Sequence, residues 1–274
     1  MSETPEKFID IAEVIRKKNP NLLRILPGFA IRYLKRLIHQ DEINRIIYDY
    51  RHCHGLNFVR SVLDDMHISY STEGLDRLPA DGRYVFASNH PLGGFDGLVL
   101  MDAIGTTFPD IRFIVNDLLL NIKNFDPVFV PVNKHGQQTA EYARRIDETY
   151  AGNAQVLYFP AGLCSRKIKG KITDLKWKKN FIRKAVQYRR DVVPVYFEGR
   201  NSGFFYNLAN IRKALGIRAN IEMTFLVDEL FKQKGRHFRL RFGDPIPFGV
   251  FDGSKSGDAW ADEVRRKVYA QRDA

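Results

Sequence analysis

Two patterns of hydrophobic and polar positions divide the chain near residue 67. From residue 8 to residue 66, apolar residues recur at helical spacing with polar residues between them. The spacing predicts helices over residues 8–18, 22–39, 41–51 and 56–66. We therefore expect residues 1–66 to form a helical N-terminal extension.

After residue 67 the pattern changes to short apolar runs separated by amphipathic stretches. This alternation is typical of an α/β domain, and it predicts a mixed, mostly parallel central sheet flanked by helices over residues 67–274. The predicted strands cover residues 68–73, 84–88, 112–115, 128–132, 155–159, 192–197, 221–225 and 238–242. The predicted helices cover residues 97–104, 138–150, 178–189, 208–215 and 259–271.

The segment 22–39 combines a strong apolar stripe with basic residues such as Arg24 and Arg32, around a Pro27-Gly28 break. One interpretation is a helix at a membrane surface, with its apolar side among acyl chains and its basic side toward lipid phosphates. The other is that the stripe packs on the α/β domain and leaves the charges solvated. The sequence leaves both interpretations open.

Composition narrows the possible partners. A net charge of +11 over 274 residues favours an anionic partner, either nucleic acid, a membrane surface or an acidic protein. Nucleic acid is not expected, because the chain has no zinc-finger pattern, no RNP-like aromatic strand and no obvious helix-turn-helix. No apolar run reaches the roughly 20 residues that span a bilayer, and the N-terminus lacks the order of a secretory signal. We expect a cytoplasmic protein, peripheral to the inner face of the cell membrane.

The first stretch that could carry chemistry runs from Asn89 to Asp96. It places His90 after a predicted strand and Asp96 before a predicted helix, with Gly93 and Gly94 in the turn between them. A histidine suits general-base chemistry, and a carboxylate on its other ring nitrogen would fix the tautomer. The backbone N–H groups of the two glycines could face a developing oxyanion. Alternatively, His90 only ends the strand and Asp96 only caps the helix.

The second stretch follows the predicted strand 155–159. A Pro160-Ala161-Gly162 turn leads to Cys164, Ser165 and Arg166, and a basic run then extends to Arg190 with Asp174 as its only acid. Such a run is either a solvated face or a docking surface for anions, such as lipid headgroups or an acidic acyl carrier. Cys164 as a nucleophile is a rival mechanism, but no sequence signature pairs it with a histidine. Neither cysteine, Cys53 or Cys164, has metal-ligand spacing, so no metal is expected.

In this order the blocks resemble the glycerolipid acyltransferase superfamily, typified by bacterial 1-acyl-glycerol-3-phosphate acyltransferases. The similar blocks are residues 73–79, 84–90, 129–134, 159–162, 193–199 and 242–246. The resemblance covers roughly residues 68–248. It implies that His90 is the general base and Asp96 its orienting acid, acting directly on an acyl thioester. The co-substrate would be acyl carrier protein or CoA, with no other cofactor.

The sequence departs from the family pattern at positions associated with binding the acyl acceptor, the molecule that receives the acyl group. Five residues separate His90 from Asp96 where the family usually has four, so the loop must bulge. Ala161 stands where the family usually has glutamate, the arginine is displaced to Arg166, and Asn133-Lys134 replaces another arginine. These departures favour the hemolysin-like branch, whose members include O-acyltransferases of lyso-aminolipids, over glycerol phosphate recognition. The candidate substrate-binding residues are Asn133, Lys134, Pro160, Ala161, Gly162, Ser165 and Arg166.

The resulting prediction is an O-acyltransferase that moves a fatty acyl chain from a thioester to the hydroxyl of a lyso-lipid. Under it, Asp96→Asn should fold normally and lose most of its activity. Two alternatives remain: N-acylation of a small amine such as an amino acid, and a non-catalytic lipid- or membrane-binding protein.

Overall fold

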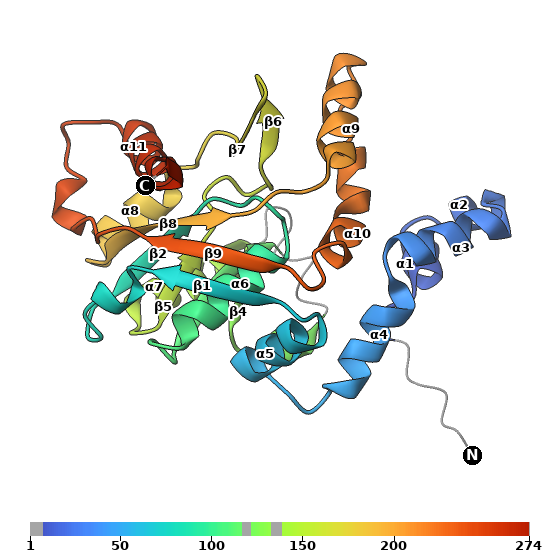
Figure 1. Ribbon diagram of the computed structural model, residues 1–274, viewed down its shortest axis with the longest axis horizontal. Coiled ribbons are helices and arrows are strands. Elements are labelled where there is room, and N and C mark those ends of the chain that lie inside the picture. The colour runs from blue at the N-terminus through green and yellow to red at the C-terminus, as the bar shows by residue number, and fades with distance from the viewer. Residues whose placement is uncertain (1–7, 117–121, 133–138, 274) are drawn as a thin grey trace.

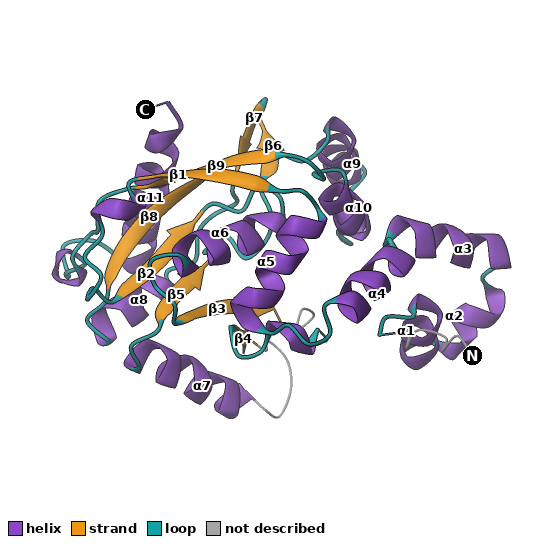
Figure 2. Cartoon of the chain, turned by 60° about the horizontal axis from the view of Figure 1, so that its bottom comes forward, coloured by secondary structure: helices purple, strands orange, loops and turns teal. Residues whose placement is uncertain are grey.

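The computed structural model describes residues 8–116, 122–132 and 139–273. At its centre lies a seven-stranded sheet with strand order β1-β9-β8-β2-β5-β3-β4 (Figures 1 and 2). The strands are β1 (Ser69–Glu73), β2 (Tyr84–Ser88), β3 (Ile111–Asn116), β4 (Phe129–Val132), β5 (Gln155–Tyr158), β8 (Asp191–Glu198) and β9 (His237–Phe242). Only the β8–β9 pair is antiparallel within this described sheet. The predicted mixed, mostly parallel α/β sheet is confirmed.

Strand β2 is covered on both faces. All five of its residues are buried, and successive side chains point to opposite sides of the sheet. Phe86 belongs to the hydrophobic cluster on one face, whereas Val85 and Ala87 belong to the cluster on the other. A continuous apolar run in the sequence therefore marks a central strand of a sheet with helices on both sides.

Helices supply the two clusters. Helices α5 (Gly55–Asp65) and α6 (Phe95–Gly105) contribute buried side chains to one of them. Helices α7 (Thr139–Ala151), α8 (Asn180–Gln187) and α11 (Gly257–Ala270) contribute to the other. Helices α9 (Gly203–Ala214) and α10 (Leu226–Phe231) follow β8 and lie at one end of the sheet (Figure 1).

The first helices form an arm that projects from the sheet (Figures 1 and 2). They are α1 (Ile11–Lys18), α2 (Pro20–Ile25), α3 (Gly28–Leu37) and α4 (Gln40–Asp49). Helix α3 has no buried residue. Ile25, Phe29 and Tyr33 are 77%, 68% and 58% exposed. Across the described residues, no helix is both long enough and apolar enough to span a bilayer.

The predicted boundary at residue 66 does not coincide with the packing. Ile46 and Ile47 of α4, with Phe58 and Leu63 of α5, belong to the same hydrophobic cluster as the sheet. Helix α5 and the end of α4 are therefore part of the α/β body, and within the arm none of the described side chains of α1 to α3 joins this cluster.

The prediction of a strand over residues 221–225 is wrong. This segment is a 3-10 helix, Ile221–Phe225, which leads into α10. Its apolar alternation suggested a strand, but Glu222 is fully buried in an ion pair with Arg166 and Arg212, which a sheet interior would not provide.

A small hairpin was not predicted. Strands β6 (Arg166–Ile168) and β7 (Lys171–Thr173) pair antiparallel within the basic run. Lys169 and Gly170 both have positive φ, which is the signature of a tight two-residue hairpin turn. The start of the basic run therefore stands away from the sheet as a hairpin (Figure 1).

Candidate active site

His90 and Asp96 are in contact. The Nδ1 atom of His90 lies 2.9 Å from Oδ2 of Asp96. The loop between them turns at Gly93, whose φ of +80° is a conformation that glycine adopts at low cost. The bulge that the sequence required is thus built without separating the pair.

The carboxylate of Asp96 is also the acceptor for the backbone of its own loop. It is fully buried. Oδ2 accepts from the N–H groups of Leu92 at 2.9 Å and Gly93 at 3.2 Å, and Oδ1 accepts from those of Gly94 and Gly97, both at 3.0 Å. A carboxylate in the first turn of α6 also interacts favourably with the helix dipole. The N-cap of α6 is Gly94 and not Asp96, so Asp96 does not have the capping role that the sequence offered as an alternative; its carboxylate contacts His90 and accepts from the N–H groups of its own loop.

These hydrogen bonds correct one expectation. The N–H groups of Gly93 and Gly94 point at the carboxylate of Asp96, so they are not free to receive an oxyanion. The two glycines instead let the loop turn so that their N–H groups reach the carboxylate of Asp96.

Hydrogen bonding sets the tautomer of His90. An ionised carboxylate only accepts hydrogen bonds, so the neutral imidazole carries its proton on Nδ1 and leaves Nε2 with a lone pair. The ring stacks on Phe159 with centroids 4.1 Å apart and planes 18° apart. The side chain is 17% exposed. A fixed, partly exposed imidazole whose Nε2 has no hydrogen-bond partner among the described residues is suited to proton abstraction.

Electrostatics favour charge on both partners. Burial by itself lowers the pKa of His90, but the charge of Asp96 and the hydrogen bond to it outweigh burial and raise the pKa above its usual value. Burial raises the pKa of Asp96, yet the charge of His90 and its hydrogen bond, with N–H groups of the loop, bring it below the usual value. The imidazolium that forms during proton transfer is therefore stabilised in place.

A second buried carboxylate, Asp174, holds the backbone around His90. Its Oδ1 accepts from the backbone N–H of His90 at 3.2 Å and from Oγ of Ser165 at 2.5 Å, and its Oδ2 accepts from Nε1 of Trp177 at 2.8 Å. The Ser165 N–H donates to the carbonyl of His90 at 2.7 Å. Burial raises the pKa of Asp174 against the opposing effect of these hydrogen bonds. This role was not predicted from the sequence, although an isolated acid within a basic run was a signal that could have indicated it.

Ser165 and Arg166 lie in the interior. Ser165 is 1% exposed. Nη2 of Arg166 donates to Oε1 of Glu222 at 3.0 Å, and its Nη1 donates to the carbonyl oxygen of Cys164 at 2.9 Å. Glu222 is also paired with Arg212 at 2.8 Å. The guanidinium of Arg166 is thus committed to a buried anion, which contradicts its expected role in holding an acceptor.

Cys164 does not have the character of a nucleophile. Its thiol is buried, and burial raises its pKa to about 11, so the thiolate is scarce near neutral pH.

The remaining predicted residues lie in the turn after β5, whose preceding residue Phe159 stacks on His90, or outside the residues that the structure describes. Pro160 and Ala161 are buried in the turn after β5, and the carbonyl of Pro160 accepts from the N–H of Lys178 at 3.0 Å. Gly162 occupies the turn with φ +66°. The predicted Asn133 and Lys134 lie outside the described residues.

Comparisons with known proteins identify a matching family and two similar proteins. A family described as Acyltransferase matches residues 13–274. A lyso-glycine lipid O-acyltransferase of Bacteroides thetaiotaomicron is 44% identical over 263 residues, which are 96% of this chain and 97% of that protein. A protein of the same name from Phocaeicola vulgatus is 42% identical over 263 residues, covering 96% and 94% respectively.

A solved structure has a similar fold. The 1-acyl-sn-glycerophosphate acyltransferase of Thermotoga maritima aligns over 94% of this chain and 98% of its own, with a TM-score of 0.50 and 17% identity. The family match and both relatives span the sheet and the His90–Asp96 loop together.

Proposed function

This chain belongs to the acyltransferase family and is an acyltransferase, and from that premise we propose that it transfers a fatty acyl group from a thioester to the hydroxyl of a lyso-lipid. The observation that carries the chemistry is the contact between the partly exposed His90 and the buried Asp96, whose 2.9 Å hydrogen bond leaves Nε2 of His90 available as a base. Asp174 is proposed as a positioning residue, because it holds the backbone N–H of His90.

The proposed reaction proceeds without a covalent acyl-enzyme. Nε2 of His90 takes the proton of the acceptor hydroxyl while the oxygen attacks the thioester carbonyl carbon, and Asp96 stabilises the imidazolium. When the tetrahedral intermediate collapses, the C–S bond breaks and the imidazolium returns its proton to the departing thiolate. General-base assistance of this kind contributes about 10²- to 10⁴-fold to the rate.

The acceptor is proposed to be a lyso-glycine lipid. Two relatives above 40% identity carry that name, and each aligns over nearly its whole length. The burial of Arg166 against Glu222 agrees with this choice, because it takes away a cation that a glycerol phosphate acceptor would use.

Product chemistry tests the proposal and separates it from N-acylation. The purified protein should convert a lyso-glycine lipid to the diacyl product with an acyl thioester donor, and mild alkali should release the newly added chain because it is held by an ester. A new chain that resists mild alkali would indicate an amide and would favour the N-acyltransferase alternative. If no acceptor in a panel of lyso-lipids and amino acids is acylated, the non-catalytic alternative gains support.

We also propose that the protein acts at the inner face of the cell membrane through its helical arm. The support is the exposure of Ile25, Phe29 and Tyr33 beside Arg24, a combination that suits a membrane interface. Phe29→Glu/Tyr33→Glu in the full chain should reduce flotation with anionic vesicles, and unchanged flotation would contradict the membrane role. These side chains are already exposed, so the thermal stability should change little.

A further inference from the structure

Helix α9 exposes an apolar stripe to solvent. Four apolar side chains follow one another at intervals of four, three and four residues, which places them along one side of the helix: Phe204, Leu208, Ile211 and Leu215. Phe204, Ile211 and Leu215 are 52%, 58% and 69% exposed. The stripe continues past the end of the helix with Ile217, which is 40% exposed. Large apolar side chains gathered on one exposed face mark an interaction site.

The other side of α9 attaches the helix to the body. Phe205, Tyr206 and Ala209 are buried. Phe205 and Tyr206 form a hydrophobic cluster with Cys164, against which Leu226 of α10 packs. A helix that only packs on the body needs one apolar face, so the exposed stripe is an additional feature of α9.

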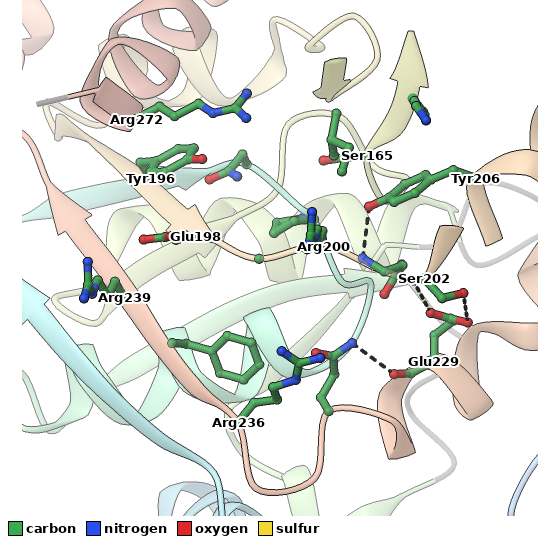
Figure 3. Close-up of a pocket in the computed structure, with 18 of the residues that line it drawn as sticks. Ser165, Tyr196, Glu198, Arg200, Ser202, Tyr206, Glu229, Arg236, Arg239 and Arg272 are labelled. Atoms are coloured by element: carbon green, nitrogen blue, oxygen red, sulfur yellow. Dashed lines mark hydrogen bonds between the residues drawn. The ribbon is translucent and has the colours of Figure 1, made fainter. Parts of the chain in front are cut away.

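Hydrogen bonds fix α9 relative to α10. Glu229 of α10 accepts from the N–H and from Oγ of Ser202, both at 2.6 Å, and Ser202 is the N-cap of α9 (Figure 3). The hydroxyl of Tyr206 accepts from the N–H of Asn201 at 3.1 Å. The stripe therefore belongs to a firmly held part of the fold.

Helix α10 contacts both the catalytic loop and the arm. A Cβ added to Gly93 would lie only 2.8 Å from Cδ1 of Leu226, so this leucine rests directly on the loop. The ring of Phe231 stacks on His39, the N-cap of α4, with centroids 4.1 Å apart. Helices α9 and α10 lie at the end of the sheet nearest the arm (Figures 1 and 2). Packing through one helix thus connects the catalytic loop with the arm and with α9.

The charge around the stripe is entirely positive. Residues 199–221 include no Asp or Glu. Lys213 and Arg218 are exposed and lie next in sequence to the apolar positions Leu215 and Ile217. Apolar side chains among Lys and Arg suit a helix at a membrane surface, and anionic lipids attract such cations. A twofold contact with a second copy of the chain would bring these cations toward their own counterparts, which like-charge repulsion opposes.

We propose that the outer face of α9, with the segment after it, is a second membrane-contact surface that rests on an anionic bilayer. Leu215 and Ile217 enter the acyl boundary, and Lys213 and Arg218 meet lipid phosphates. The inference rests on the proposed action at the membrane and adds a contact that the arm does not supply. The arm alone would let the body swing, whereas two contacts hold the edge that carries α10 and the catalytic loop against the lipid.

Fluorescence quenching tests this contact directly. Full-length Leu215→Trp is mixed with vesicles of phosphatidylcholine and phosphatidylglycerol whose acyl chains carry bromine, which quenches a tryptophan only at short range. The native Trp177 and Trp260 are buried and provide a constant background. The matched control is Val186→Trp, at a 40% exposed apolar position of α8. Emission of Leu215→Trp should fall on binding, and that of Val186→Trp should not change.

Charge substitutions measure how much the stripe contributes. Ile211→Glu/Leu215→Glu should bind the same vesicles without bromine at least about tenfold more weakly, while Val186→Glu stays within about twofold. The reason is that two apolar side chains that would enter the bilayer become anions. All three positions are exposed, so the melting temperature should change little.

The outcomes separate this surface from the arm and from other occupants. Unquenched Leu215→Trp on vesicles that carry the protein would overturn the proposal, because the arm would then be the only contact. Absence of wild-type binding would overturn both contacts. A loss of self-association in Ile211→Glu/Leu215→Glu, with vesicle binding unchanged, would assign the stripe to a second copy and refute the bilayer. If Phe29→Glu/Tyr33→Glu floats normally and the α9 variant does not, the arm proposal fails and this one stands.

Discussion

Replacing Asp96 with asparagine should destabilise the protein as well as impair acyl transfer, contrary to the expectation from the sequence that this variant folds normally. The carboxylate accepts five hydrogen bonds, from Nδ1 of His90 and from four backbone N–H groups. An asparagine side chain has one oxygen and one NH₂ group, and the NH₂ group cannot accept. If the oxygen stays with His90, the NH₂ group faces the N–H groups of Gly94 and Gly97.

The magnitude follows from those two stranded donors. A buried N–H group left without an acceptor costs about 1–3 kcal/mol, so the free energy of unfolding should fall by about 2–6 kcal/mol. Asparagine is neutral and loses less solvation on burial than a carboxylate, which places the expected value in the lower half of that range. Against a typical total of about 5–15 kcal/mol, the loss is large.

Urea denaturation of wild-type protein and Asp96→Asn measures this loss, with the m-value checked for constancy. Asp64→Asn, an exposed aspartate of α5, is the matched control and should change the stability by less than about 0.5 kcal/mol. A loss below about 1 kcal/mol for Asp96→Asn would refute the assignment of the carboxylate as the acceptor for its loop. The acid limb of the kcat/KM profile should also move to lower pH in this variant, because the charge that raises the pKa of His90 is gone.

Three further predictions concern Gly93, the buried thiol of Cys164 and the imidazole of His90. Gly93→Ala should lower the free energy of unfolding by about 1–3 kcal/mol, since φ is +80° and a new Cβ would lie 2.8 Å from Leu226 Cδ1; Gly170→Ala has the same φ but open space, so a larger loss there in urea denaturation would contradict this account. Cys164→Ser should keep activity within about threefold, and intact-mass analysis of the wild type with an acyl thioester should detect no acyl adduct, because the pKa of the thiol is about 11. The wild-type kcat/KM should rise with pH to a plateau with a midpoint above about 6.5, because His90 must lose a proton whose pKa is raised; a midpoint below that value would refute the raised pKa.

Local patterns in the sequence were enough to predict the central fold. The apolar run of residues 84–88 predicted a strand, and the structure shows in addition that both of its faces are covered, because Phe86 and Val85 lie in different clusters. The His90–Asp96 contact followed from a glycine turn of limited length, because so short a loop can bring its ends together. These features depend on residues close in sequence.

Features that depend on distant residues were not predictable in this way. Arg166 looked available for an acceptor, but Glu222, far along the chain, takes its guanidinium into the interior. Glu222 lies in the segment Ile221–Phe225, which is a 3-10 helix and not the predicted strand. The role of Asp174 also depends on a contact across 84 positions, to the backbone N–H of His90. Spacing and periodicity do not report such pairings, whereas burial of the charged partners does.

The most direct test of the central claim is the turnover of His90→Ala with an acyl thioester and a lyso-glycine lipid. His52→Ala, an exposed histidine before α5, serves as the control for loss of an imidazole, and both variants must retain the wild-type melting temperature. Removal of the general base should reduce kcat by about 10²-fold or more, with partial recovery on adding imidazole, while the control stays within about twofold. Turnover of His90→Ala within a few-fold of the wild type would contradict the mechanism.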